Sequence, residues 1–62
     1  MKLVGFTTVN GNEVVVNPEH VVAVHRYGLD HSEINLINGI DVQVKNLSPM
    51  QVGHLLAEGR LP

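Results

Sequence analysis

Three consecutive residues, His25, Arg26 and Tyr27, carry side chains suited to binding a small anion that contains an aromatic ring. An arginine guanidinium forms paired hydrogen bonds with a phosphate, a tyrosine ring offers a face for base stacking, and a histidine can donate a further hydrogen bond. We therefore predict that His25, Arg26 and Tyr27 bind a nucleotide-like ligand. The alternative is structural: a strand that is apolar at its start becomes polar where its end meets solvent.

The four histidines, His20, His25, His31 and His54, do not form a standard zinc-binding spacing, and the chain has no cysteine. Structural zinc sites place four ligands close together, and cysteine is prominent among them. We therefore expect no metal and no other cofactor. The histidines are expected to be solvated or to lie at an interface.

Residue arrangements typical of catalysis are equally sparse. No serine lies in a glycine-rich nucleophile elbow, and Ser32 and Ser48 are interpreted as a turn residue and a helix cap. Asp30 and Glu33 flank a turn, where we expect both carboxylates to be solvated. The sequence therefore predicts a protein that is not an enzyme.

Charge and composition exclude several classes of partner. The formal net charge is -2 with only four Lys and Arg residues, so the chain lacks the basic stripe that a nucleic-acid polymer requires. No apolar run is long enough for a membrane span or a signal peptide, and the absence of cysteine fits a reducing compartment. We expect a soluble, cytoplasmic protein that forms a single domain over residues 1–62 and binds neither nucleic-acid polymers nor membranes.

Short β-branched runs predict five strands, because valine, isoleucine and threonine favour an extended backbone. The breaks between these runs contain Asn-Gly or Asn-Pro pairs and a polar segment at residues 28–31. The expected strands cover residues 2–9, 13–16, 21–27, 33–37 and 40–45.

The residue order within these runs predicts which side chains face the core. Residues 13–16 are interpreted as a strand that is buried on both faces, because its apolar residues are consecutive. In the third strand, one face is expected to hold Val22, Val24 and Arg26. The other face is expected to hold Val21, Ala23, His25 and Tyr27.

Two hairpins are expected, at Asn10-Gly11-Asn12 and at Asn38-Gly39. The second pair predicts a type I′ turn, which needs positive φ at both central residues. The strands on either side of this turn alternate in polarity, and their expected inward-facing residues are Ile34, Leu36, Ile40, Val42 and Val44.

The C-terminal segment predicts one helix that runs from about residue 49 to residue 58. Ser48 can cap this helix, Pro49 suits its first position, and Gln51 completes a capping box. Gly59 fits a left-handed C-terminal cap, and Pro62 prevents continuation. The apolar face of the helix is expected to hold Val52, Leu55 and Leu56.

The expected fold is mainly β with one C-terminal α-helix (α+β), in the order β-β-β-β-β-α. We expect one small, curled antiparallel sheet of about five strands, with the helix on one face. A chain of 62 residues of which 44% are hydrophobic cannot bury all of its valine, leucine and isoleucine behind one thin sheet. We therefore expect a homo-oligomer.

Four segments resemble the FlbD/SwrD family of small flagellar proteins. They are NGNEVVVN at residues 10–17, VVAV at 21–24, EINLING at 33–39 and VQV at 42–44, and together they span roughly residues 10–52. The resemblance implies a non-enzymatic regulator that acts on motility through other proteins.

The residues that folding leaves unexplained, His25, Arg26 and Tyr27, suit a small anion better than a flat protein surface. We predict a non-enzymatic homo-oligomer that captures or sequesters a small anionic, nucleotide-like ligand at its subunit interfaces, comparable to the nucleotide sponges of phages. The alternative is an FlbD/SwrD-like regulator or scaffold that binds a protein partner.

Overall fold

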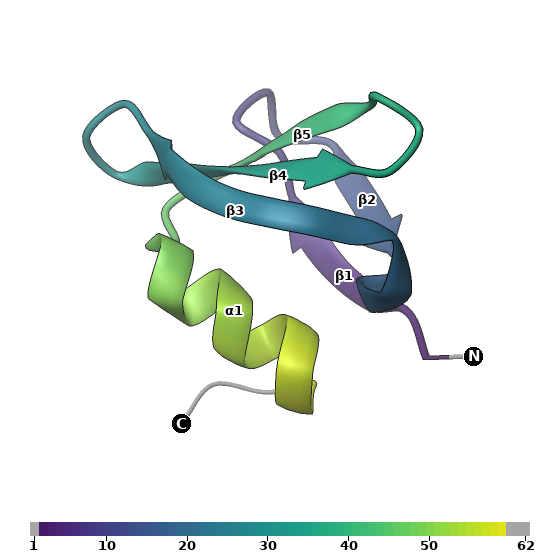
Figure 1. The fold of residues 1–62 in the computed structure, drawn as a ribbon. Helices are drawn as coiled ribbons and strands as arrows, with labels where there is room; N and C mark the ends of the chain where they lie inside the picture. Colours follow the sequence, from purple (N-terminus) through teal and green to yellow (C-terminus); the bar gives the residue numbers. More distant parts are fainter. Residues whose placement is uncertain (1, 60–62) are drawn as a thin grey trace.

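The computed structural model describes residues 2–59, which form five strands, one short 3-10 helix and one α-helix (Figure 1). The predicted class, mainly β with a C-terminal helix, is confirmed. The elements are β1 (Val4–Thr7), β2 (Glu13–Val16), η1 (Pro18–His20), β3 (Val21–Tyr27), β4 (His31–Leu36), β5 (Asp41–Val44) and α1 (Pro49–Glu58).

The strands form two antiparallel sheets, so the prediction of a single sheet is wrong. β1 pairs with β2, and a second sheet has the strand order β3-β4-β5. The two sheets meet just beyond β1, where Thr8 forms an isolated bridge with Val44 and the Val9 N–H donates to the Gln43 carbonyl oxygen at 3.1 Å. This contact is too short to merge the sheets, because β1 ends at Thr7 instead of continuing to Val9 as expected.

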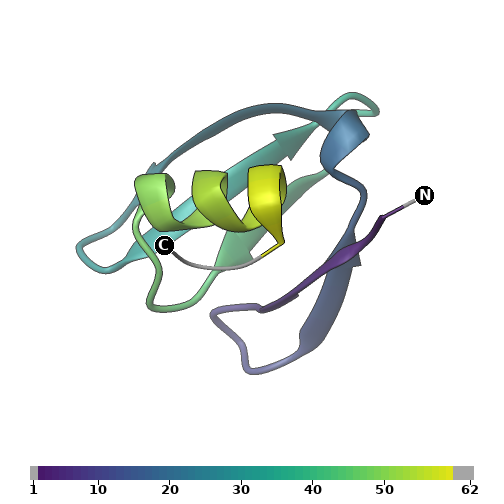
Figure 2. The same ribbon diagram turned by 90° about the horizontal axis from the view of Figure 1, so that it is seen from below.

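Helix α1 lies along the concave side of the sheets, as Figure 2 shows from below. The predicted capping box is confirmed: Ser48 Oγ accepts from the Gln51 N–H at 3.2 Å, and Gln51 Oε1 accepts from the Ser48 N–H at 2.9 Å. Gly59 ends the helix with a φ of 78°, as expected, whereas Pro62 lies outside the described residues. Nowhere in residues 2–59 is there a helix with the length and apolarity needed to cross a membrane.

The hydrophobic core lies between the two sheets and α1. Its most deeply buried large side chains, Ile34, Val44 and Val52, come from β4, β5 and α1 and have no exposed area. Leu55 and Leu56 are only half-buried. The remaining buried core residues are Val4, Phe6, Val16 and Val42.

The Asn38-Gly39 pair forms a tight hairpin loop, but the predicted type I′ turn is wrong. Of the two residues, only Gly39 has a positive φ, of 83°. The Gly39 N–H donates to the Leu36 carbonyl oxygen at 3.1 Å, which gives a type I turn followed by a left-handed glycine. The loop therefore takes in one more residue than expected, and Ile40 precedes β5 with 53% of its surface exposed instead of facing the core.

Two further predictions about apolar faces are wrong. β2 is not buried on both faces, since Val15 is 62% exposed. In β3, a register shift between Val21 and Ala23 removes Val22 from the face that holds Val24, and Val22 is 67% exposed. Consecutive valines have no polar alternation that would fix their register, so the sequence pattern does not locate this bulge.

β4 begins at His31, which brings Ser32 into the strand instead of a turn and corrects the prediction for that residue. Ser32 is fully buried, and its hydroxyl donates to the Leu47 carbonyl oxygen at 2.6 Å. The hydrogen bond fastens the segment before α1 to the inner face of the three-stranded sheet. Ser32 is thus a structural residue whose hydroxyl is already used.

Candidate functional site

Arg26 lies near the end of β3 and pairs in register with Ser32 of β4. Its Nη1 donates to the Leu29 carbonyl oxygen at 3.1 Å. Within residues 2–59 the guanidinium forms no ion pair with a carboxylate. A guanidinium has five N–H donors, so this single hydrogen bond orients the group and leaves most of its donors available.

A depression of about 390 Å³ opens beside Arg26. Three separate segments form it: the end of β3 with the following turn, the segment after β5, and the start of α1. The Ser32–Leu47 hydrogen bond explains this convergence, because Ser32 lies opposite Arg26 and Leu47 directly precedes Ser48. The residues that line the depression are Arg26, Leu29, Asp30, Asn46, Ser48 and Gln51.

Hydrogen-bond donors predominate among the polar groups of this depression. Because Gln51 Oε1 already accepts from the Ser48 N–H, the side-chain NH₂ of Gln51 is available to a ligand. Asn46 adds a second amide, and Asp30 is the acidic residue of the lining. The arrangement suits a ligand that has an anionic end and neighbouring hydroxyl groups.

The backbone positions Asn46 in this lining. Asn46 has a positive φ of 59°, and its N–H donates to His31 Nδ1 at 3.1 Å. Asparagine is one of the few residues other than glycine that adopt this conformation readily. The kink after β5 therefore brings Asn46 toward the start of α1.

His25 and Tyr27 lie on the opposite face of β3 from Arg26, because successive side chains of a strand alternate. Within one chain, the structure does not bring the three predicted ligand-binding residues together. His25 Nε2 is 3.1 Å from Glu33 Oε1. Tyr27 pairs in register with His31 and is 42% exposed.

Glu33 is the centre of a polar network on this outer face of the three-stranded sheet. Its carboxylate accepts hydrogen bonds from Gln43 Nε2 at 2.7 Å and from Asn35 Nδ2 at 3.5 Å. Asn35 also donates to Asp41 Oδ1 at 2.8 Å. The Glu33 carboxylate beside His25 opposes the approach of an anion, so the outer face suits an anionic ligand less well than the depression beside Arg26.

The histidines are dispersed over the molecule. His20 ends η1, His31 begins β4, and His54 Nδ1 is 3.9 Å from Glu58 Oε2 on α1. In the part of the chain that the structure describes, no group of three or more His, Asp or Glu side chains is placed to hold a metal ion.

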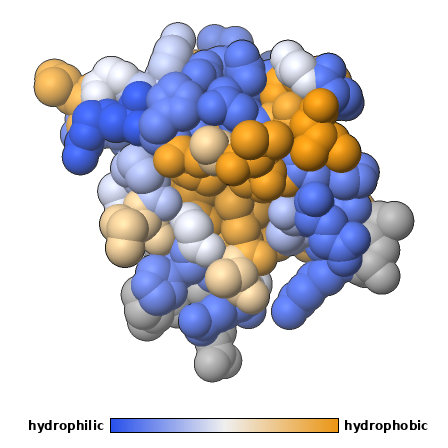
Figure 3. Space-filling view, viewed as in Figure 1, coloured by the Kyte–Doolittle hydropathy of each residue, from blue (hydrophilic) through white to orange (hydrophobic). Residues whose placement is uncertain are grey.

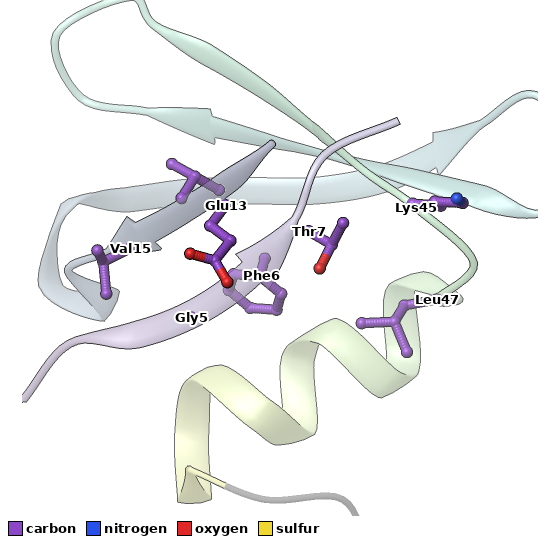
Figure 4. A pocket seen from close by; sticks show the side chains of 8 residues that line it. Gly5, Phe6, Thr7, Glu13, Val15, Lys45 and Leu47 are labelled. Atoms are coloured by element: carbon purple, nitrogen blue, oxygen red, sulfur yellow. The ribbon is translucent and has the colours of Figure 1, made fainter. Parts of the chain in front are cut away.

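A second depression, of about 670 Å³, lies beside the β1–β2 hairpin (Figure 4). Its walls are largely apolar, and the charged side chains at it, Glu13 and Lys45, have opposite signs. It therefore offers an anion no convergent set of donors. The lining residues are Gly5, Phe6, Thr7, Glu13, Val14, Val15, Lys45 and Leu47.

The sequence identified Arg26 but not the other polar residues around it. Ser48 and Gln51 were fully explained as caps, and Asn46 has no neighbour in sequence that indicates a site. The only local signal is the asparagine itself, which follows a strand where positive φ is common for this residue type. Its proximity to Arg26 depends on pairing between β3, β4 and β5.

Comparisons of this chain with protein-family models, with curated proteins and with solved structures find no match.

Proposed function

We propose that this protein is a non-enzymatic, self-associating binding protein that captures a small anionic, nucleotide-like ligand, with Arg26 as the principal contact. The observation that supports this function is the depression lined by Arg26, Asn46 and Gln51, whose side chains carry N–H donors and come from three segments of the chain. Capture of a ligand requires affinity and abundance but no reacting group, which agrees with the absence of a catalytic motif in the sequence.

Each side chain has a distinct role in this proposal. Arg26 forms charge-assisted hydrogen bonds with a phosphate, and the amides of Asn46 and Gln51 donate to further phosphate oxygens. Asp30 accepts from a sugar hydroxyl, which distinguishes a nucleotide from bare phosphate. His25 and Tyr27 face away from the depression, so within one chain they do not contact a ligand bound there.

The proposal is tested by thermal unfolding in the presence of inorganic phosphate, AMP, cyclic AMP and ATP. A ligand at one hundred times its Kd adds about 2.7 kcal/mol to the free energy of unfolding. We expect at least one nucleotide to raise the Tm more than phosphate does. Arg26→Ala should weaken this binding by about 1.5 to 3 kcal/mol, because it removes charge-assisted hydrogen bonds.

Lys45→Ala is the matched control, because it removes an exposed cation that lies outside the depression. It should leave nucleotide binding unchanged. Equal losses in the two variants would indicate unspecific attraction between charges. Arg26 is exposed and makes one exposed hydrogen bond. Arg26→Ala should therefore have the same Tm as the unsubstituted protein in the absence of ligand. Unfolding of this variant would show that Arg26 is a structural residue and would remove the main support for ligand capture.

An FlbD/SwrD-like regulator that binds a protein partner is the second candidate. Large exposed apolar side chains favour it, since Val22, Leu29 and Ile37 are 67%, 88% and 64% exposed. A location among flagellar genes, together with no change in Tm from any nucleotide, would favour the regulator. A location among phage genes would favour ligand capture.

A further inference from the structure

β3 is an edge strand whose outer side is open. It is seven residues long and pairs with β4 on one side, while no strand among residues 2–59 pairs with its other side. An open edge presents unpaired backbone N–H and C=O groups, which another β-strand can complete. Figure 1 shows this edge along the front of the molecule, above α1.

The hydrogen bonds of β4 show which backbone groups of β3 face the open side. The Leu36 N–H donates to the Ile40 carbonyl oxygen at 2.9 Å, so the polar backbone groups of Leu36 face β5. These directions alternate along an antiparallel strand. The backbone of Asn35 therefore faces β3, where Asn35 pairs with Ala23.

The same alternation continues along β3. The backbone groups of Ala23, His25 and Tyr27 face β4, whereas the N–H and C=O groups of Val24 and Arg26 face the open edge. Val24 and Arg26 are separated by one residue, which is the spacing of hydrogen-bonded positions along one strand of an antiparallel pair. A second strand can therefore form two such pairs with this edge.

Apolar side chains adjoin the edge. Figure 3 shows an apolar patch on this side of the molecule. Val24 of β3 and Leu55 and Leu56 of α1 pack against the core but are only half-buried. At the start of the strand, Val22 is 67% exposed. A strand placed along β3 would remove part of this surface from water.

We propose that the open edge of β3 binds β3 of a second copy, in an antiparallel arrangement about a two-fold axis at His25. This register pairs Val24 of each copy with the partner's Arg26, so that the outward backbone groups of both residues are satisfied. It joins the two three-stranded sheets into one continuous sheet of about six strands. The interface is isologous, because each copy contributes the same strand.

The side chains at the two ends of β3 are complementary in size in this register. The exposed ring of Tyr27 lies opposite the partner's Ala23, and exposed Val22 lies near the partner's Gly28. Large residues therefore meet small ones at both ends of the strand pair. On the inner face, the aliphatic part of Arg26 covers the partner's Val24 while the guanidinium keeps its hydrogen bond to the Leu29 carbonyl oxygen.

The available area favours a second copy that associates reversibly. A stable interface covers about 800 Å² per partner, which is about a fifth of the 4161 Å² surface of this chain. β3 extends for only about 23 Å at roughly 3.3 Å per residue. A contact limited to an edge of this length falls short of that area, so the dimer should dissociate on dilution.

This inference rests on the self-association in the proposed function and names the surface that carries it. Sedimentation velocity of the complete chain between about 10 µM and 1 mM should show a monomer that converts to a dimer as concentration rises. Val22→Lys should raise the dimer dissociation constant at least tenfold, because it places a charge at the interface of both copies.

Val15→Lys is the matched control, because Val15 is 62% exposed on β2, the edge strand of the other sheet. It should leave the dimer dissociation constant unchanged. A monomer throughout the concentration range, or a dimer that Val15→Lys dissociates and Val22→Lys does not, would overturn the proposal.

Amide hydrogen exchange provides a second measurement that does not depend on a variant. The N–H groups of Val24 and Arg26 should become protected as concentration rises, and their continued rapid exchange in a dimer would exclude pairing through β3. AMP binding by monomeric Val22→Lys is measured in parallel. Retained AMP binding alongside a failed dimer prediction would leave ligand capture intact. A dimer that forms as expected, with no AMP binding by the unsubstituted chain, would leave the dimer proposal intact.

Discussion

The β1–β2 and β4–β5 hairpins have the same loop but different surroundings. In the first, the Gly11 N–H donates to the Thr8 carbonyl oxygen at 2.9 Å; in the second, the Gly39 N–H donates to the Leu36 carbonyl oxygen at 3.1 Å. Both glycines have left-handed φ values, of 87° and 83°. The chain thus reverses direction twice by the same local chemistry.

The two hairpins differ in what covers their faces. The β4–β5 hairpin lies between β3 and the end of β1, buries Ile34 and Val44 completely, and carries the Glu33 network on its outer face. The β1–β2 hairpin has an open edge and leaves Val15 exposed. Local sequence therefore determines the turn, whereas position in the fold determines how much each strand contributes to stability.

The largest expected effect is at Ile34, at the centre of the second hairpin. Ile34→Ala should lower the free energy of unfolding by about 2 to 5 kcal/mol, because it leaves a cavity in a fully buried position. The total for a chain of this length is on the order of 3 to 9 kcal/mol. Urea unfolding followed by circular dichroism measures the change.

Ile40→Ala is the matched control for Ile34→Ala, because the same side chain is truncated where it is 53% exposed. Its effect should stay within about 0.5 kcal/mol. Similar losses in the two variants would show that the second hairpin is not the centre of the core.

Removing a hydroxyl group from either hairpin should have a smaller effect on the free energy of unfolding. Ser32→Ala should cost about 1 to 3 kcal/mol, because it removes a fully buried hydroxyl and leaves the part-buried Leu47 carbonyl oxygen without its partner. Thr8→Ala should cost less, since Thr8 Oγ1 accepts from the Asn12 N–H at 3.1 Å in an exposed loop. Equal costs in urea unfolding would contradict the assignment of Ser32 as the link between β4 and the segment before α1.

The two hairpin loops should be destabilised equally when their glycines are replaced. Gly11→Ala and Gly39→Ala should each cost about 1 to 2 kcal/mol, because alanine is strained at positive φ. An added Cβ would meet nothing within 4 Å at either position, so steric contact does not contribute. Thermal unfolding that separates the two variants by more than about 1 kcal/mol would show that the surroundings influence the loops after all.

The sequence predicted features that depend on neighbouring residues and missed those that depend on distant ones. The capping box of Ser48 and Gln51 and the left-handed Gly59 were predicted because their signals lie within one turn of the helix. The burial of Ser32 was missed, because its partner Leu47 is 15 residues away. A local pattern contains no information about which segment will lie above a strand.

The candidate site shows the same limit. Arg26 was predicted as a binding residue because a charged side chain is unusual at the end of an apolar strand. Asn46 lies beside Arg26 only because β3 pairs with β4 and β4 pairs with β5. The bulge at Val22 was also missed, because two consecutive valines fit either register. Strand alternation did predict that His25 and Tyr27 face away from Arg26, and this division limits what one chain can bind.

The smallest expected effect on the free energy of unfolding is that of Gly53→Ala. Comparison with Gly11→Ala and Gly39→Ala distinguishes the cost of backbone strain from the effect of chain entropy. Gly53 lies inside α1, is exposed, and has open space around the position of a Cβ. Its φ is not positive, in contrast to those of Gly11 and Gly39. Gly53→Ala should therefore raise the free energy of unfolding by about 0.5 to 1 kcal/mol, because alanine has fewer conformations to lose on forming a helix. Thermal and urea unfolding at low concentration measure the gain, and a loss of stability in Gly53→Ala would mean that this face of α1 lies against another surface that has no room for a methyl group.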